Sequence, residues 1–215
     1  MRMHELLSSL AKRRPIFHSE ADFQHALAWE FQLSSPNASI RLEQQIAAQG
    51  GRVHLDLLVK DRSNHVAVEL KFKTKKAFIT WGEEQFQLRN QAAQDLGRYD
   101  FLKDIARIER YVETHPGSEG YVVLLTNDPT YWKQSKKSHS IDAAFRIHEG
   151  RSITGELAWG SEASKGTMKA RESAIKIRAS YESAWHDFSH IEQELFRYIE
   201  VHIPCVSNIQ SASST

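Results

Sequence analysis

The sequence lacks a second cysteine, because Cys205 is the only one. A lone cysteine excludes a disulfide framework and a cysteine-based zinc site, and it suits a reducing cytosol. No apolar run approaches the roughly 20 residues that a membrane helix needs, and scattered Arg and Lys residues interrupt the N-terminal segment. We therefore expect a cytoplasmic protein with no membrane partner.

The sequence also lacks an excess of either charge. It holds 28 Lys and Arg residues against 27 Asp and Glu residues, a formal net charge of +1, so no global field indicates a polyanionic partner. Any nucleic-acid-binding surface must therefore be local. The sequence has neither a Walker loop nor a glycine-rich dinucleotide fingerprint, so phosphate cleavage would not be coupled to nucleotide hydrolysis within this chain.

Hydrophobic residues make up 40% of the 215, which is enough for one domain, expected at residues 1–206 with a disordered tail at 207–215. Helical periodicity predicts helices at residues 5–13, 19–33 and 83–115. Alternation predicts strands at residues 39–44, 53–59, 66–72, 121–126, 143–147, 152–159, 173–180 and 196–203. This order predicts an α/β fold whose mixed central sheet is flanked by helices, with additional C-terminal β-strands.

Residues 52–72 are predicted to form an antiparallel hairpin, because a polar turn from Asp61 to Asn64 separates two alternating runs. Pairing Lys60 with His65 fixes the register and makes one face wholly apolar. The facing apolar pairs are then Leu55 with Leu70, Leu57 with Val68, and Val59 with Val66.

The same register places Asp56 opposite Glu69, with Lys71 on the same face. Opposed carboxylates on adjacent strands have Cβ atoms ~5 Å apart and repel each other. A proton on one acid, the ammonium of Lys71 or a bound hard divalent cation could compensate, and the cation explains the whole set best. The alternative is an exposed strand face whose charges serve only solubility. The nearly continuous apolar character of both runs, typical of strands covered on both faces, argues against that alternative.

Two acids and a lysine in this arrangement are suited to phosphodiester hydrolysis. A Mg²⁺ ion, or Mn²⁺ in its place, held by Asp56 and Glu69 would polarise a phosphoryl oxygen and lower the pKa of a bound water. Lys71 would orient that water or stabilise developing negative charge.

An acid in one strand and Glu-x-Lys in the next, with an acid-bearing helix upstream, resembles the PD-(D/E)xK nuclease superfamily, also called the restriction-endonuclease-like fold. Here the motif reads His54-Leu55-Asp56, twelve intervening residues, then Glu69-Leu70-Lys71. Leu55 stands where the superfamily's name has proline. The resemblance implies a restriction-endonuclease-like mixed central sheet with its core at about residues 19–126 and a C-terminal β extension at about 140–204.

The resemblance implies a role for each matching residue. Asp56 and Glu69 resemble the metal ligands, the Leu70 carbonyl a further ligand, and Lys71 the catalytic lysine. Glu20 resembles the additional metal-site acid that many members place on the helix before the sheet. Its alternative role is that of an N-terminal helix acid favoured by the helix dipole.

Substrate contacts are expected on the long predicted helix, where Gln87, Gln91, Gln94 and Arg98 form one stripe. Some exonuclease-like members of the superfamily use a Gln and a Tyr on this helix near the metal and substrate. Gln94 and Arg98 are the preferred candidates for phosphate contacts, with Gln91 and Lys73 as further ones. The alternative is a solvated face opposite the apolar stripe.

The leading hypothesis is therefore a Mg²⁺-dependent nuclease that acts on DNA in repair or in defence against foreign DNA. One alternative is an RNA nuclease, which uses the same chemistry. Another is a catalytically silent nucleic-acid-binding or assembly subunit, against which the complete acid-acid-lysine set argues. The expected partner is nucleic acid, and cutting both strands of a duplex would favour a homodimer. A local phosphate-binding rim is expected from Lys71, Lys73, Lys75, Lys76, Lys133, Lys136, Lys137, Lys165, Lys169 and Arg171. The alternative is that each cluster is ordinary solvated surface.

Overall fold

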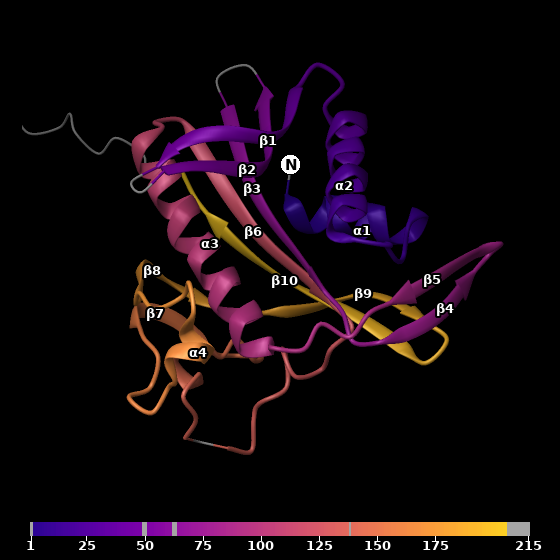
Figure 1. The fold of residues 1–215 in the computed structure, drawn as a ribbon. Helices are drawn as coiled ribbons and strands as arrows, with labels where there is room; N and C mark the ends of the chain where they lie inside the picture. The colour runs from indigo at the N-terminus through magenta and orange to yellow at the C-terminus, as the bar shows by residue number, and fades with distance from the viewer. Residues whose placement is uncertain (1, 49–50, 62–63, 138, 206–215) are drawn as a thin grey trace, which may run out of the picture.

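The computed structural model describes residues 2–48, 51–61, 64–137 and 139–205 (Figure 1). The helices are α1 (Met3–Arg13), α2 (Glu20–Ser34), α3 (Gln94–Thr114), α4 (Lys165–Met168) and the 3₁₀ helix η1 (Ala143–Phe145). The strands are β1 (Ser39–Ala48), β2 (Gly51–Asp61), β3 (Asn64–Lys73), β4 (Ala77–Trp81), β5 (Glu84–Leu88), β6 (Ser118–Thr126), β7 (Ser152–Leu157), β8 (Ile175–Glu182), β9 (Trp185–Ile191) and β10 (Glu194–Ile203).

A six-stranded sheet in the order β1-β2-β3-β6-β10-β9 forms the centre of the molecule. β3 and β6 are parallel, and every other neighbouring pair in this sheet is antiparallel. The parallel pair needs a crossover, which contains α3. The prediction of an α/β fold with a mixed central sheet flanked by helices is therefore confirmed.

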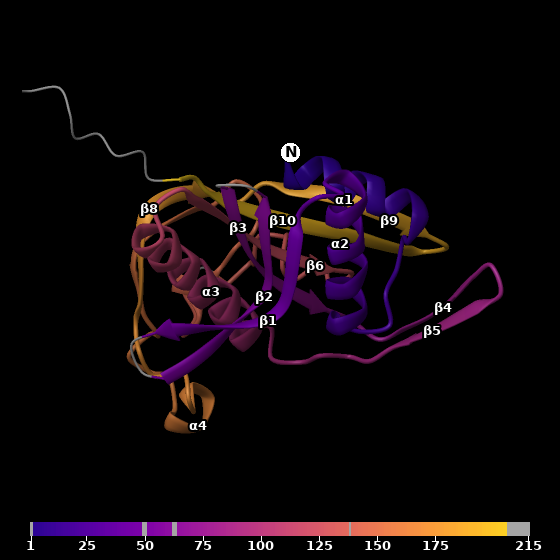
Figure 2. The same cartoon turned by 90° about the horizontal axis from the view of Figure 1, so that it is seen from above.

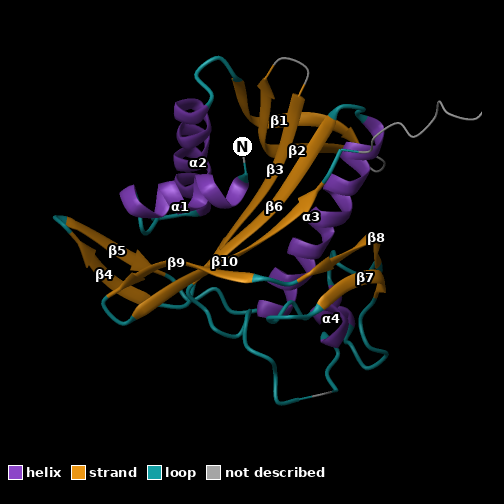
Figure 3. Cartoon of the chain, turned by 180° about the vertical axis from the view of Figure 1, so that it is seen from behind, coloured by secondary structure: helices purple, strands orange, loops and turns teal. Residues whose placement is uncertain are grey.

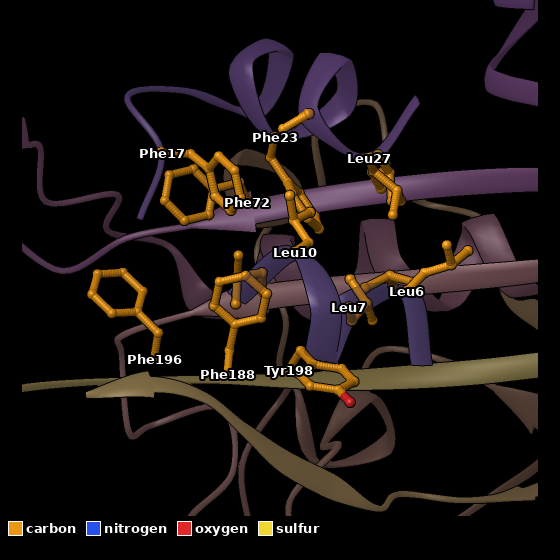
Figure 4. Close-up of a cluster of buried hydrophobic side chains, with 14 of the residues drawn as sticks. Leu6, Leu7, Leu10, Phe17, Phe23, Leu27, Phe72, Phe188, Phe196 and Tyr198 are labelled. Atoms are coloured by element: carbon orange, nitrogen blue, oxygen red, sulfur yellow. The ribbon is translucent and has the colours of Figure 1, made fainter. Parts of the chain in front are cut away.

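Each face of the sheet has its own hydrophobic core. Figure 2 shows α1 and α2 on one side of the sheet and α3 on the other. Figure 4 shows the first core, where Phe23 and Leu27 of α2 meet Phe72 of β3 and Tyr198 of β10. The second core packs α3 against β6 and β10 and includes residues of the β7–β8 pair. Since both faces are covered, a charged side chain in the middle of the sheet, such as Glu69 of β3, lies against protein rather than solvent.

The predicted helix at residues 83–115 is wrong in its first third, because Glu84–Leu88 is strand β5 and the helix begins only at Gln94. Residues 84–88 alternate, with Phe86 and Leu88 buried and their neighbours exposed. β5 pairs with β4 across a turn at Gly82, which has a φ of 61°. Figure 3 shows this pair as an arm that extends away from the central sheet.

The C-terminal strands are only partly as predicted. The strand predicted at 143–147 is wrong, because Ala143–Phe145 is a 3₁₀ turn, and β7, in the segment predicted at 152–159, pairs with β8. β10 confirms the strand predicted at 196–203, but it lies inside the central sheet beside β6, with β9 as the edge strand. The tail predicted at 207–215 lies outside the described residues. No helix in the described ranges is both long and apolar enough to cross a membrane.

Candidate functional site at the split between β2 and β3

The β2–β3 ladder confirms the predicted register and then ends at the candidate site. Lys60 pairs with His65, and the last pair at the other end is Leu57 with Val68. The prediction that Asp56 and Glu69 continue this ladder is therefore wrong, because the two strands separate one residue earlier.

The side of the sheet to which alternate β2 side chains point also changes at Asp56. Leu57 packs in the core beside α1 and α2, whereas Leu55 packs in the core beside α3. The prediction that both share one apolar face is thus wrong. The regular alternation is interrupted at Asp56, and on β1 the neighbouring Glu43 has a positive φ of 50° and no ladder partner.

Carboxylates occupy the split that opens between β2 and β3. The backbone N–H of Leu70 donates to Asp56 Oδ2 at 2.6 Å, and the N–H of Phe72 donates to Glu20 Oε2 at 2.8 Å. These two amides point toward β2 and have lost the carbonyl partners that a continued ladder would supply. Asp56 and Glu20 therefore replace β2 at this end of β3.

Helix α2 supplies the polar groups on its side of the split. Ser19 caps the helix, because its side chain accepts from Asp22 N, and this places Glu20 in the first turn. Gln24, one turn further along, is buried, and its Nε2 donates to the Asp56 carbonyl at 2.6 Å and to Glu43 Oε1 at 2.9 Å. Gln24 was not identified from the sequence, although its i,i+4 relation to Glu20 places both on one helix face.

Helix α3 supplies the charged groups on the opposite side. Arg107 donates from Nη1 to Glu69 Oε1 at 2.6 Å and from Nη2 to Asp104 Oδ1 at 2.7 Å. Lys71 Nζ lies 2.8 Å from Asp104 Oδ2 and donates to the Leu70 carbonyl at 3.0 Å. Glu69 and Asp104 are almost completely buried. Four of these groups thus form one network, with Asp56 and the Leu70 backbone alongside it.

The cluster carries more negative than positive charge, and two of its acids, Glu69 and Asp104, are buried. Its carboxylates are Glu20, Asp56, Glu69 and Asp104, and its cations are Lys71 and Arg107, so full ionisation leaves an excess of two negative charges. No other described residue forms an ion pair with these six groups.

The electrostatics of the cluster follow from this imbalance. Burial raises the pKa of Asp56 from 3.8 to about 6, and the charges of Asp104 and Glu20 add to that rise. Burial and then Asp104 raise the pKa of Glu69 as well. Burial alone would lower the pKa of Lys71, but Asp104 overrides it and raises that pKa above its ordinary value. The lysine is therefore held as an ammonium, while both acids gain from any added positive charge.

The donors at the split fit a hard divalent cation in kind and in charge. Asp56, Glu69 and the Leu70 carbonyl offer only oxygen, and the cluster has two negative charges in excess of its cations when it is fully ionised. Within the described ranges, no group of three or more His, Cys, Asp or Glu side chains is arranged to hold a metal ion. Mg²⁺ commonly binds through one or two carboxylates and completes its shell with water and substrate phosphate, so two carboxylates and a carbonyl suffice. Arg107 would have to release Glu69 for that carboxylate to bind an ion.

The four residues predicted to form a stripe on the long helix do not share it, because Gln87 and Gln91 lie outside α3. Gln91 precedes the helix, and its side chain accepts from Thr74 N at 3.3 Å. Gln94 begins α3 and donates to Asp128 Oδ2 at 3.0 Å. Arg98 is buried and pairs with Asp142 at 2.7 Å. Lys73 is half-buried and passes close to Gly97 of α3.

In the absence of divalent cation, wild-type stability is expected to fall between pH 4 and pH 6 relative to an Asp56→Asn variant. A raised carboxyl pKa means that the native state favours the protonated acid. The resulting stabilisation is fully present below pH ~4 and is lost as the pH passes through ~6, amounting to about 2–3 kcal/mol. Added Mg²⁺ at pH 7.5 should restore stability to the wild type in a concentration-dependent way.

Urea unfolding in EDTA and in Mg²⁺, followed by tryptophan fluorescence, measures both effects. The comparison with Asp56→Asn removes the contributions of other titrating groups. A difference between the two proteins that stays flat from pH 4 to pH 7 would contradict the expectation. So would a stabilisation by Mg²⁺ that is equally large in the variant.

Comparison with known proteins adds no identification. No protein family, no curated protein and no solved structure matches this chain. The residues at the split and their chemistry are therefore the grounds on which a function can be assigned.

Proposed function

We propose that the protein is a divalent-cation-dependent nuclease of the PD-(D/E)xK type, with a restriction-endonuclease-like fold, which hydrolyses phosphodiester bonds in DNA. The observation that carries the proposal is the split between β2 and β3, which gathers Asp56, the Leu70 carbonyl and Lys71 beside the buried Glu69. An excess of carboxylates over cations, with two of the acids buried, lowers stability, which favours a functional reason for them.

Asp56, Glu69 and the Leu70 carbonyl would hold the cation, with Mg²⁺ or Mn²⁺ as the matching ions. When bound, the cation would polarise a phosphoryl oxygen and lower the pKa of a coordinated water. Glu20 would act mainly through its charge and by holding the Phe72 amide, 2.8 Å from its Oε2.

Lys71 would serve as an electrostatic group rather than as a general base. Asp104 lies 2.8 Å from its Nζ and raises its pKa, so the side chain stays protonated at neutral pH. An ammonium in that position can orient the attacking water and stabilise the negative charge that develops on the phosphoryl group. Asp104 thus acts as a positioning residue for Lys71.

The direct test incubates the purified protein with linear duplex, circular duplex, single-stranded DNA and RNA, each in Mg²⁺, Mn²⁺ or EDTA. Cleavage of DNA in either metal, abolished by EDTA, is the expected result. Preferential cleavage of RNA would change the proposed substrate from DNA to RNA and leave the proposed reaction, phosphodiester hydrolysis, unchanged. Binding of nucleic acid with no cleavage in any metal would overturn the proposal in favour of a catalytically silent subunit.

A further inference from the structure

A basic groove runs beside the candidate site, between α3 and the segment that leads into β8. Its volume is about 400 Å³. Six cationic side chains line it: Lys103, Arg107, Arg110, Arg171, Lys176 and Arg178. Glu172 is the one acidic side chain in the lining. The chain as a whole is nearly neutral, so this is a local concentration of positive charge.

Half of these cations are held by carboxylates and half are not. Arg107 pairs with Glu69, Arg178 pairs with Glu113, and Arg171 binds Asp100 through two hydrogen bonds of 2.7 and 2.8 Å. The other three side chains form no ion pair with any residue that the structure describes, and all three are exposed: Lys103, Arg110 and Lys176. The groove therefore offers three cations that remain available to an anion.

The shape of the array decides what kind of anion fits it. Lys103, Arg107 and Arg110 lie at spacings of four and three on one face of α3, a stripe about 10 Å long at 1.5 Å per residue. That length matches roughly three nucleotides of a B-form strand, which carries one phosphate per 3.4 Å. A single phosphate group could contact only part of it. A protein interface usually has an apolar centre depleted in charged residues, whereas six of the thirteen residues that line this groove are cationic.

The groove also connects to the candidate site through one residue. Arg107 lines the groove, and its guanidinium reaches Glu69 Oε1 at 2.6 Å. An anion that draws Arg107 toward the groove would therefore release the carboxylate of Glu69. Substrate binding and completion of the cation site would then be linked.

We propose that this groove binds the sugar-phosphate backbone of the substrate strand and leads it to the split between β2 and β3. The proposal rests on the proposed nuclease function and adds the path of the substrate to it. Lys103, Arg110 and Lys176 bind phosphates along that path. Arg107, at its inner end, exchanges Glu69 for a phosphate next to the scissile bond.

The test measures binding separately from cleavage. Fluorescence anisotropy in EDTA reports the affinity of the full chain for labelled single-stranded and duplex 20-mers over a range of salt concentrations. A Lys103→Gln/Arg110→Gln/Lys176→Gln variant is expected to lose at least ~10-fold in affinity. The slope of log affinity against log salt concentration should correspond to about two to three fewer released counterions. A matched variant, Lys12→Gln/Arg41→Gln/Lys60→Gln, removes the same charge from exposed positions on α1, β1 and β2, outside the groove, and should stay within about twofold of wild type.

Unchanged affinity and salt dependence in the groove variant would overturn the proposal, and so would an equal loss in the matched variant. Absence of any nucleic-acid binding by the wild type would overturn it as well. Cleavage assays in Mg²⁺ separate the two proposals. A groove variant that still binds and cleaves DNA like the wild type refutes only the proposal that the groove binds the substrate strand. Binding that depends on the groove, without cleavage in any metal, refutes only the nuclease.

Discussion

Replacing Asp56 with asparagine is expected to lower DNA cleavage by ~100-fold or more and to leave the protein folded. The asparagine oxygen can still accept from Leu70 N, which Asp56 Oδ2 binds at 2.6 Å, so the end of β3 remains capped. The charge, however, is lost, and with it the main attraction for a divalent cation. Because burial raises the pKa of Asp56 to about 6, removing its charge should leave stability at pH 7.5 unchanged or higher.

Steady-state cleavage and urea unfolding of the same preparations measure this outcome. The matched control is Asp61→Asn, the same substitution on the same strand at an exposed position, and it should cleave like the wild type. Lys71→Ala should also lose ~100-fold or more, because it removes the ammonium beside the Leu70 carbonyl. Equal cleavage by the wild type and both site variants would point to a contaminating nuclease and would remove the case for this site.

The combination of lost activity with retained stability is what separates a functional site from a structural one. A structural ion pair stabilises the fold, so neutralising one partner usually lowers stability. Here the acids exceed the bases, and their burial raises the pKa values of Asp56 and Glu69. Sites of this kind lower stability in return for function.

Local patterns were sufficient to predict the strands that carry the site. Alternation and the match of apolar residues fixed the pairing of Lys60 with His65, and thereby brought Asp56 close to Glu69 and Lys71. The same reasoning could not predict where the ladder ends. That point depends on α2, whose Glu20 and Gln24 supply the hydrogen bonds that take the place of the missing strand contacts.

Asp104 and Arg107 show the second limit of sequence reasoning. They lie more than 30 residues from the motif and meet Glu69 and Lys71 only because α3 crosses back over the sheet. One signal was present in the sequence. Asp104 falls three residues after Phe101 and four before Ile108, both fully buried, so an acid there lies on the core side of the helix. Such a position marks a charged residue that needs a partner.

The errors in the substrate stripe had a different cause. Helical spacing was assumed to extend through residues 83–115, which grouped Gln87, Gln91, Gln94 and Arg98 on one face. A two-stranded arm at the start of this segment separates Gln87 and Gln91 from the helix. The remaining two residues bind other protein groups, because Gln94 donates to Asp128 and Arg98 pairs with Asp142.

Arg98→Ala is expected to lower the free energy of unfolding by about 3 kcal/mol and to leave the salt dependence of DNA binding unchanged. Arg98 and Asp142 are both buried and pair at 2.7 Å, and removing one partner of such a pair leaves an uncompensated charge. Burial alone would raise the pKa of Asp142, yet hydrogen bonds from Ser140 and Arg98 lower it to about 2. Arg146, 3.2 Å from Asp142, compensates part of the loss.

The pH dependence of this effect identifies the pair as its source. A lowered carboxyl pKa stabilises the native state above the unfolded value, and that contribution is lost as the pH falls from about 4 to about 2. The destabilisation by Arg98→Ala, measured by urea unfolding, should therefore be smaller at pH 3 than at pH 7. Arg110→Ala, an exposed arginine on the same helix, should change stability by no more than ~0.5 kcal/mol. An Arg98→Ala protein that is as stable as the wild type but binds DNA with a weaker salt dependence would contradict this structural role. It would support the predicted phosphate contact of Arg98 instead.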